Sequence, residues 1–271
     1  MPSPPVASSP IMPSRFFALL LALITGVPAF AASTQPTLRV MSYNIHHGEG
    51  VDGKVDLERI AKLIVEARAD VVALQEVDRG TERTQKRDLP AELAKLTGLI
   101  VRFDKNIAHQ GGDYGNAVLT KFPLKSAKNT HLKMAGPGEQ RGIQQLLLDV
   151  RGREVLFLNT HLDHRRDEAE RLLSAAQVRE IVADAGKLPV ILCGDFNATP
   201  ESQTSARLQE FLTDTWAVVG RGPGFTIPVA KPAKRIDYVW ISREFIEPLT
   251  MEVLRSNASD HLPVVAELRL K

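Results

Sequence analysis

The chain has 271 residues, of which 44% are hydrophobic and 24% are charged, a composition typical of a globular protein with one sizeable core. Its 34 basic and 32 acidic residues leave a formal net charge of +2. So small a charge excludes a strong overall field that would attract nucleic acid or an acidic membrane, although a local basic groove stays open.

The first 31 residues have the pattern of an export signal. Arg15 precedes an apolar stretch over residues 16–24, and a small-residue A-x-A cleavage site ends at Ala31. The apolar stretch is too short to span a bilayer comfortably. We therefore predict a signal peptide over residues 1–31, with Met12 as an alternative start and an uncleaved anchor as the alternative fate. The protein is then exported, to the periplasm or beyond, with no transmembrane segment after cleavage.

A strand is predicted over residues 38–44, after a short linker at residues 32–36. Asp56 is a favourable N-cap for a helix whose apolar residues recur at helical spacing, namely Leu57, Ile60, Ile64 and Ala67. A second buried strand over residues 71–75 ends at Glu76. The order of strand, helix and strand predicts a parallel crossover in an α/β layer.

Short strands without intervening helices are predicted in the middle of the chain. A helix from Pro90 to about Thr97 precedes them, and a turn-rich loop is expected over residues 111–116. The strands are expected near residues 99–103, 117–120, 124–133, 143–150 and 155–160. Their close spacing predicts antiparallel pairing, with a hairpin turn at residues 151–153.

The last third of the chain is predicted to contain two helices and several strands. The helices are expected from about Arg166 to Asp184 and from about 201 to 211. The strands are expected near residues 190–194, 236–241, 251–254 and 264–270. The sole cysteine, Cys193, lies in an apolar run and is interpreted as a packing residue, so the core must form without a disulfide. One domain over residues 37–271 is predicted.

Polar side chains lie at or near the ends of several predicted strands, most of them after the strand, with Asp237 near the start of one strand and Asp260 and His261 just before the last. They are Asn44, Glu76, His161, Asp195 with Asn197, Asp237, and Asp260 with His261. Any one of them alone is explained as a cap or turn residue. Ligands gather at the carboxyl ends of strands in open α/β sheets, so the recurrence of the pattern predicts one shared site.

The chemistry of these side chains indicates a hard cation. Carboxylates and carboxamides without thiolates suit Mg²⁺ or Mn²⁺, which keep coordination positions for water and a phosphate oxygen. The pair His46-His47 offers a softer metal site, but a polar loop rim is favoured because no cysteine or further histidine is spaced for it. Signatures of serine hydrolases, zinc proteases, P-loop proteins and dinucleotide-binding proteins are missing from the sequence.

The chain resembles the endonuclease/exonuclease/phosphatase superfamily, the DNase I-like proteins. The matching segments stand in the family's order, at residues 42–44, 74–77, 159–162, 194–197, 236–238 and 259–263. The resemblance implies a four-layer α/β sandwich, with two mixed β-sheets flanked by helices. It also implies that Glu76 is the principal ligand of a Mg²⁺ or Mn²⁺ ion, with Asn44 and Asp260 in or near its shell.

The resemblance implies five catalytic side chains. Asp195 would align or deprotonate the attacking water, and Asn197 would help to position that water and the phosphate. His161 would contact the phosphate. His261, paired with Asp237, would stabilise the transition state or act as the acid or base.

The local sequence is most similar to small secreted bacterial members of the superfamily and to the lumenal domain of fungal proteins that remodel GPI lipids. The similarity lies in residues 44–48 and 115–119. Five further side chains are expected at the phosphate pocket or its rim: Asn116, Arg141, Asp163, His164 and Arg165. For the first two, a turn amide and a solvated arginine are the alternatives.

The expected substrate is a phosphate ester, with a small phosphodiester or a phospholipid or GPI-type head group favoured over duplex DNA. DNA-cleaving members carry basic and aromatic loops, whereas aromatic residues make up 6% of this chain. The specificity motifs of the inositol phosphatases are not intact. The expected function is therefore an exported metal-dependent phosphoesterase, acting as a monomer. A secreted deoxyribonuclease and a catalytically inactive binding module on the same fold are the alternatives.

Overall fold

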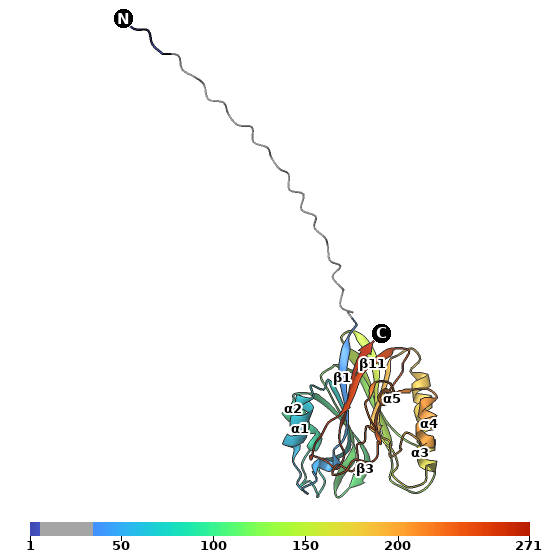
Figure 1. The fold of residues 1–271 in the computed structure, drawn as a ribbon. Helices are drawn as coiled ribbons and strands as arrows, with labels where there is room; N and C mark the ends of the chain where they lie inside the picture. The colour runs from blue at the N-terminus through green and yellow to red at the C-terminus, as the bar shows by residue number, and fades with distance from the viewer. Residues whose placement is uncertain (6–34) are drawn as a thin grey trace. The chain divides into compact units, whose positions relative to one another are not determined.

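Two mixed six-stranded sheets form the centre of the protein in the computed structural model, which describes residues 1–5 and 35–271 (Figure 1). In spatial order the first sheet contains β11 (Ile246–Val253), β12 (Val264–Leu270), β1 (Thr37–Asn44), β2 (Val71–Arg79), β4 (Gly112–Thr120) and β3 (Ile100–His109). The second contains β5 (Leu124–His131), β6 (Gly142–Val150), β7 (Arg153–His161), β8 (Val190–Asp195), β10 (Asp237–Ile241) and β9 (Thr213–Asp214). Most of the predicted signal peptide lies outside the described residues.

Helices cover the outer face of each sheet, so residues 35–271 form four layers (Figure 1). On the first sheet, α1 (Leu57–Glu66) and α2 (Leu89–Thr97) pack their apolar sides over Met41, Val72 and Leu119. On the second, α3 (Ala169–Asp184) and α4 (Gln203–Gln209) pack over Leu158, Leu192 and Trp240. The four-layer α/β sandwich is therefore confirmed. None of the helices in the described residues has the length and apolar character needed to span a bilayer.

The inner faces of the two sheets meet in an apolar core. Val40 and Val118 from the first sheet pack with Phe157 and Ile191 from the second, and all four are fully buried. Cys193 lies in this core as a free thiol, and burial raises its pKa well above the ordinary value. The interpretation of Cys193 as a packing residue is thus confirmed, because a buried neutral thiol is a poor nucleophile.

Strand direction explains why the predicted site residues meet. β1 and β2 are parallel across the α1 crossover, as predicted, so Asn44 and Glu76 reach the same edge of the first sheet. β7 and β8 are also parallel, and His161 is in register with Asp195. β10 runs antiparallel to β8 and begins at Asp237, opposite Asp195. The ends of these strands therefore place their polar residues at one edge of the sandwich.

Several predicted boundaries were wrong. The expected loop over residues 111–116 is largely strand, because β4 starts at Gly112 and pairs with β3 as far as His109. A side chain at Gly115 would place its Cβ 2.0 Å from the Asp104 oxygen, so this glycine permits close strand approach and does not mark a turn.

Other differences concern element ends and short elements. β11 begins at Ile246, earlier than expected, because an edge strand tolerates Pro248 and an irregular register at that point. The helices α3 and α4 start later than predicted. Three short elements escaped prediction: the 3₁₀ helix η1 (His46–Gly48), the strand β9 and the helix α5 (Thr215–Val219).

A buried polar bridge joins the two sheets just below the site. Gln75 Nε2 donates to Asn159 Oδ1 at 2.8 Å, and Asn159 Nδ2 lies within 3.0 Å of the Leu74 and Ala117 oxygens and of Gln144 Oε1. Gln75, Asn159 and Gln144 are all fully buried. Because Gln75 precedes Glu76, this bridge fixes the backbone that carries the predicted metal ligand.

Replacing Asn159 with leucine is expected to lower the free energy of unfolding by about 3 kcal/mol, because several buried polar groups lose their partner together. Urea denaturation of the purified protein measures this change. Asn257→Leu, at an exposed position, is the matched control and should stay within about 0.5 kcal/mol of the wild type. A loss below about 1 kcal/mol in Asn159→Leu would mean that the bridge adds little to stability.

Candidate functional site

An irregularity in β2 turns Glu76 toward the site. The pairing of β2 with β4 shifts register between Leu74 and Val77, and Glu76 adopts a left-handed φ of +57° inside this bulge. Bulges next to active sites commonly redirect a side chain in this way. Glu76 is half-buried and lines a cavity of about 280 Å³ at the sheet edge.

Asn44 connects the two halves of the site. Its Nδ2 donates to Glu76 Oε1 and to Asp195 Oδ2, each at 3.0 Å. Its Oδ1 accepts from the His46 backbone N–H at 3.1 Å, which fixes the orientation of the amide. The fully buried Asn44 thus sets the spacing between the carboxylate of one sheet and that of the other.

Asp195 lies at the centre of the site. Its Oδ1 accepts from the Asn197 backbone N–H at 2.9 Å, and its Oδ2 lies 3.5 Å from His161 Nε2 and 3.7 Å from His261 Nε2. Burial, reinforced by the charge of Asp237, raises the pKa of Asp195 to about 7. A carboxylate with such a pKa can accept a proton at neutral pH.

His261 and Asp237 form a buried pair. His261 Nδ1 lies 3.0 Å from Asp237 Oδ2, and both side chains are almost inaccessible to solvent. Burial alone would lower the pKa of His261, but the charges of Asp237 and Asp195 outweigh it and raise that pKa to about 10. The imidazolium is therefore the stable form at neutral pH, with Nε2 available to donate.

His161 is held between an arginine and an amide. Its Nδ1 lies 3.1 Å from Arg141 Nη1, and its Nε2 lies 3.1 Å from Asn197 Nδ2. Burial and the charge of Arg141 hold the pKa of His161 well below its ordinary value, so the ring is neutral. A guanidinium can only donate, so Nδ1 accepts and the ring proton belongs on Nε2, 3.5 Å from Asp195 Oδ2. The Asn197 NH2 group is also a donor, so its contact with Nε2 is not a hydrogen bond in this tautomer.

Arg141 forms the basic wall of the cavity. It is buried, with Nη1 at 2.8 Å from Glu139 Oε1 and Nη2 at 3.3 Å from His164 Nδ1. Glu139, His164 and Tyr114 line the same cavity. His164 was expected at the rim, whereas Glu139 and Tyr114 were not assigned to the site from the sequence, and the only signal for Glu139 was its closeness to Arg141.

The remaining predicted residues lie farther from the cavity. Asn116 is buried, with Nδ2 at 3.5 Å from the Gly142 oxygen, so it supports the strand beside Arg141 and does not line the cavity. Asp163 and Arg165 bind each other at 2.9 Å, and neither lines the cavity.

Asp260 is connected to the site through Ser259. The Ser259 hydroxyl lies 3.3 Å from Asp260 Oδ1 and 2.7 Å from the Asn44 oxygen. In the described residues, two groups of histidine and acidic side chains bring their ligand atoms within 4.8 Å of one another. One group is Asp195, Asp237 and His261, and the other is His46, His47 and Glu76. Asp260 belongs to neither group.

The Glu76 carboxylate fits a hard divalent cation, whereas Asn44 turns its NH2 group toward Glu76 and its oxygen toward the His46 backbone N–H. Within residues 35–271 Glu76 forms no ion pair, and its one side-chain hydrogen bond comes from the neutral Asn44 amide. A half-buried carboxylate without a compensating charge is a suitable cation ligand, and oxygen donors are those that Mg²⁺ and Mn²⁺ prefer. Glu76 therefore fits the ion that the resemblance implies, and the Asn44 amide, as it is oriented, supports that carboxylate by a hydrogen bond.

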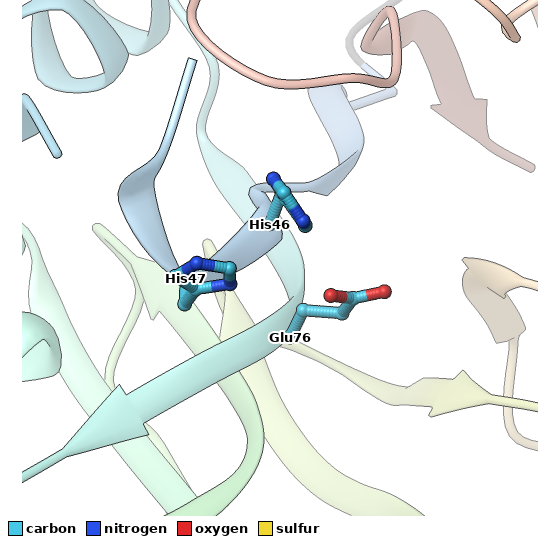
Figure 2. Close-up of side chains that lie close together, drawn as sticks. All are labelled: His46, His47 and Glu76. Atoms are coloured by element: carbon cyan, nitrogen blue, oxygen red, sulfur yellow. The ribbon is translucent and has the colours of Figure 1, made fainter. Parts of the chain in front are cut away.

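The prediction that His46 and His47 form a polar loop rim was wrong for His47. Figure 2 shows both rings beside the Glu76 carboxylate, and His47 is only 7% exposed. Burial, reinforced by the charge of Arg83, lowers the pKa of His47 to about 4, so this ring is neutral. The short turn η1 brings the pair back over the bulge of β2, an arrangement that the spacing of histidines in the sequence could not reveal.

Comparison with known proteins supports the fold and the family. YbhP of Escherichia coli (strain K12) is 27% identical over 251 residues, covering 87% of this chain and 98% of YbhP. The 5'-tyrosyl-DNA phosphodiesterase of Caenorhabditis elegans is 30% identical over 189 residues, covering 67% of this chain and 48% of that protein. The crystal structure of an endonuclease/exonuclease/phosphatase from Beutenbergia cavernae has a TM-score of 0.72 and 28% identity, covering 86% of this chain and 72% of that one.

The family profile described as "Endonuclease/Exonuclease/phosphatase family" matches residues 41–261. That range includes every predicted site residue, from Asn44 to His261. The strand order, the convergence of the strand ends and this match agree. The chain belongs to the endonuclease/exonuclease/phosphatase family, whose members generally hydrolyse phosphate esters.

Proposed function

We propose that the protein is an exported phosphoesterase that uses Mg²⁺ or Mn²⁺ and hydrolyses a small phosphodiester or phosphomonoester, with a phospholipid or GPI-type head group as the favoured substrate. The observation that carries the proposal is the position of Asp195. One carboxylate oxygen receives a hydrogen bond from Asn44 and lies within 3.7 Å of both His161 and His261. A proton acceptor with a pKa near neutrality is thus surrounded by donors that can hold a phosphate.

The arrangement supports in-line attack by water. The oxygen of the attacking water bonds to phosphorus while Asp195 accepts a proton from that water. The bond between phosphorus and the leaving oxygen breaks at the same time. His161 and Arg141 donate to the phosphoryl oxygens, and the His261 imidazolium offsets the charge that develops on them. A cation held by Glu76 would add further charge stabilisation when bound.

The cavity supports a small substrate. Its volume of about 280 Å³ fits a phosphate with a compact substituent, and its lining is mostly polar. Arg141, the buried arginine of the cavity, is paired with Glu139, so the cavity has no large excess of positive charge to attract a polyanion. These features favour a head group over duplex DNA.

A metal and substrate panel tests the proposal. Purified protein is expected to hydrolyse bis(p-nitrophenyl) phosphate, to lose that activity in EDTA, and to regain it with Mg²⁺ or Mn²⁺. Phosphatidylinositol and sphingomyelin are then compared with plasmid DNA. The nuclease alternative, which the similarity to the 5'-tyrosyl-DNA phosphodiesterase favours, requires plasmid nicking or removal of a 5'-tyrosyl group. Calorimetric cation binding without any turnover would support the inactive binding module.

Arg141→Lys is expected to raise KM about 10- to 100-fold while changing kcat less, because a lysine cannot reproduce the planar fork that contacts His161 and His164 together. Steady-state kinetics with the best substrate of the panel measures both constants. Arg179→Lys, at an exposed position on α3, is the matched control and should leave both unchanged. An unaltered KM in Arg141→Lys would remove this residue from the phosphate site.

A further inference from the structure

Two histidines that the proposed chemistry does not use lie beside Glu76. One ligand atom from each of His46, His47 and Glu76 lies within 4.8 Å of the other two, and Figure 2 shows the three side chains around a common space. The centroids of the two imidazole rings are 4.3 Å apart, with ring planes tilted by 58°. The rings therefore lie side by side at an angle.

The backbone that carries the two histidines is strained. His46 and His47 both have a left-handed φ of +45°, a conformation that costs a residue other than glycine about 1–3 kcal/mol. Two consecutive residues of this kind persist only where other interactions stabilise them. Such outliers cluster at ligand-binding sites.

Glu49 lies beside both rings. Its backbone oxygen lies 3.4 Å from His46 Nδ1, within hydrogen-bond reach, and its carboxylate lies 3.6 Å from His47 Nε2. Histidines that bind metals usually direct one ring nitrogen to a carbonyl or carboxylate, as His46 does. Within residues 35–271, Nδ1 of the buried His47 has no hydrogen-bond partner, and a buried nitrogen left unsatisfied calls for a ligand.

We propose that His46, His47 and Glu76 form a site for a divalent transition-metal ion, with Zn²⁺ as the best representative. Two imidazoles and one carboxylate suit Zn²⁺ and leave positions open, whereas Mg²⁺ prefers oxygen ligands alone. The site shares only Glu76 with the hard-cation centre. A Zn²⁺ ion here would therefore compete with the hard cation for the Glu76 carboxylate and inhibit hydrolysis. That inhibition rests on the proposed function, whereas Zn²⁺ binding itself does not.

Zn²⁺ binding without substrate tests the proposal. In competition with a chelating dye, tag-free wild-type protein should bind one Zn²⁺ ion at this site, and the double variant His46→Asn/His47→Asn should bind it about 100-fold more weakly. Asparagine tolerates the left-handed backbone, so the fold should persist, as circular dichroism will verify. Glu49→Gln should weaken binding about tenfold. His131→Asn, at an exposed histidine, is the matched control.

Two further measurements make the outcome decisive. Electron spin-echo spectroscopy of one equivalent of bound Cu²⁺ should show coupling to imidazole nitrogen that disappears in the double variant, while Mg²⁺ affinity is retained through Glu76. Equal Zn²⁺ affinity in the wild type and the folded double variant would overturn the site. Loss of Zn²⁺ binding in His161→Asn alone would assign the ion to another position. Neither outcome depends on turnover, so failure of the proposed function would be seen separately.

Discussion

Asp195→Asn is expected to lower kcat by about 10³- to 10⁴-fold with little change in KM, because the substitution removes the proton acceptor but keeps the shape of the side chain. Asn44 and the Asn197 backbone N–H hold both oxygens of this carboxylate, so its position is set without substrate. Hydrolysis of bis(p-nitrophenyl) phosphate under saturating Mg²⁺ measures the loss.

The control for Asp195→Asn is the same change at Asp184, an exposed residue at the end of α3, which should leave the rate at the wild-type level. A kcat within about tenfold of the wild type in Asp195→Asn would show that another group activates the water. His261 would then be the first residue to test, since its Nε2 lies 3.7 Å from the same carboxylate oxygen.

The residues at the strand ends could be predicted because their positions follow from local sequence. Asn44, Glu76, His161 and Asp195 stand at the end of an apolar run, and Asp237 and His261 stand before one. Parallel pairing brings Asn44 and Glu76 to one edge. The antiparallel register of β10 with β8 then places Asp237 opposite Asp195. Local pattern and strand direction together therefore determine most of the catalytic group.

The parts that escaped prediction depend on contacts between distant segments. The bulge that turns Glu76 arises from its pairing with β4, and no pattern within β2 announces it. His47 looked like a loop residue because its burial comes from the way η1 folds back, with a left-handed backbone at two histidines. Arg165 looked available for substrate, but in the structure it binds Asp163 and Glu170. Register, bulges and side-chain partners are properties of the assembled sheets.

Asp237→Asn is expected to lower kcat by about 10²- to 10⁴-fold, since His261 loses the carboxylate that orients it and stabilises its charge. The substitution should also move both limbs of the pH–rate profile to lower pH. Attraction by Asp237 is one cause of the raised His261 pKa of about 10, so the alkaline limb, where the imidazolium loses its proton, should fall by about 1–3 units.

The acid limb of the Asp237→Asn profile depends on the repulsion between the Asp237 and Asp195 carboxylates. Asp237 repels the Asp195 carboxylate and so helps to raise its pKa to about 7, which sets the pH below which the proton acceptor is lost. Without that repulsion the pKa of Asp195 falls, and the acid limb should move down by about 1 unit. Measuring kcat from pH 5 to 11, with Asp184→Asn as the control, separates the possibilities. A purely structural role for Asp237 would lower the whole profile without moving either limb, whereas the charge pair predicts that both limbs shift in the same direction.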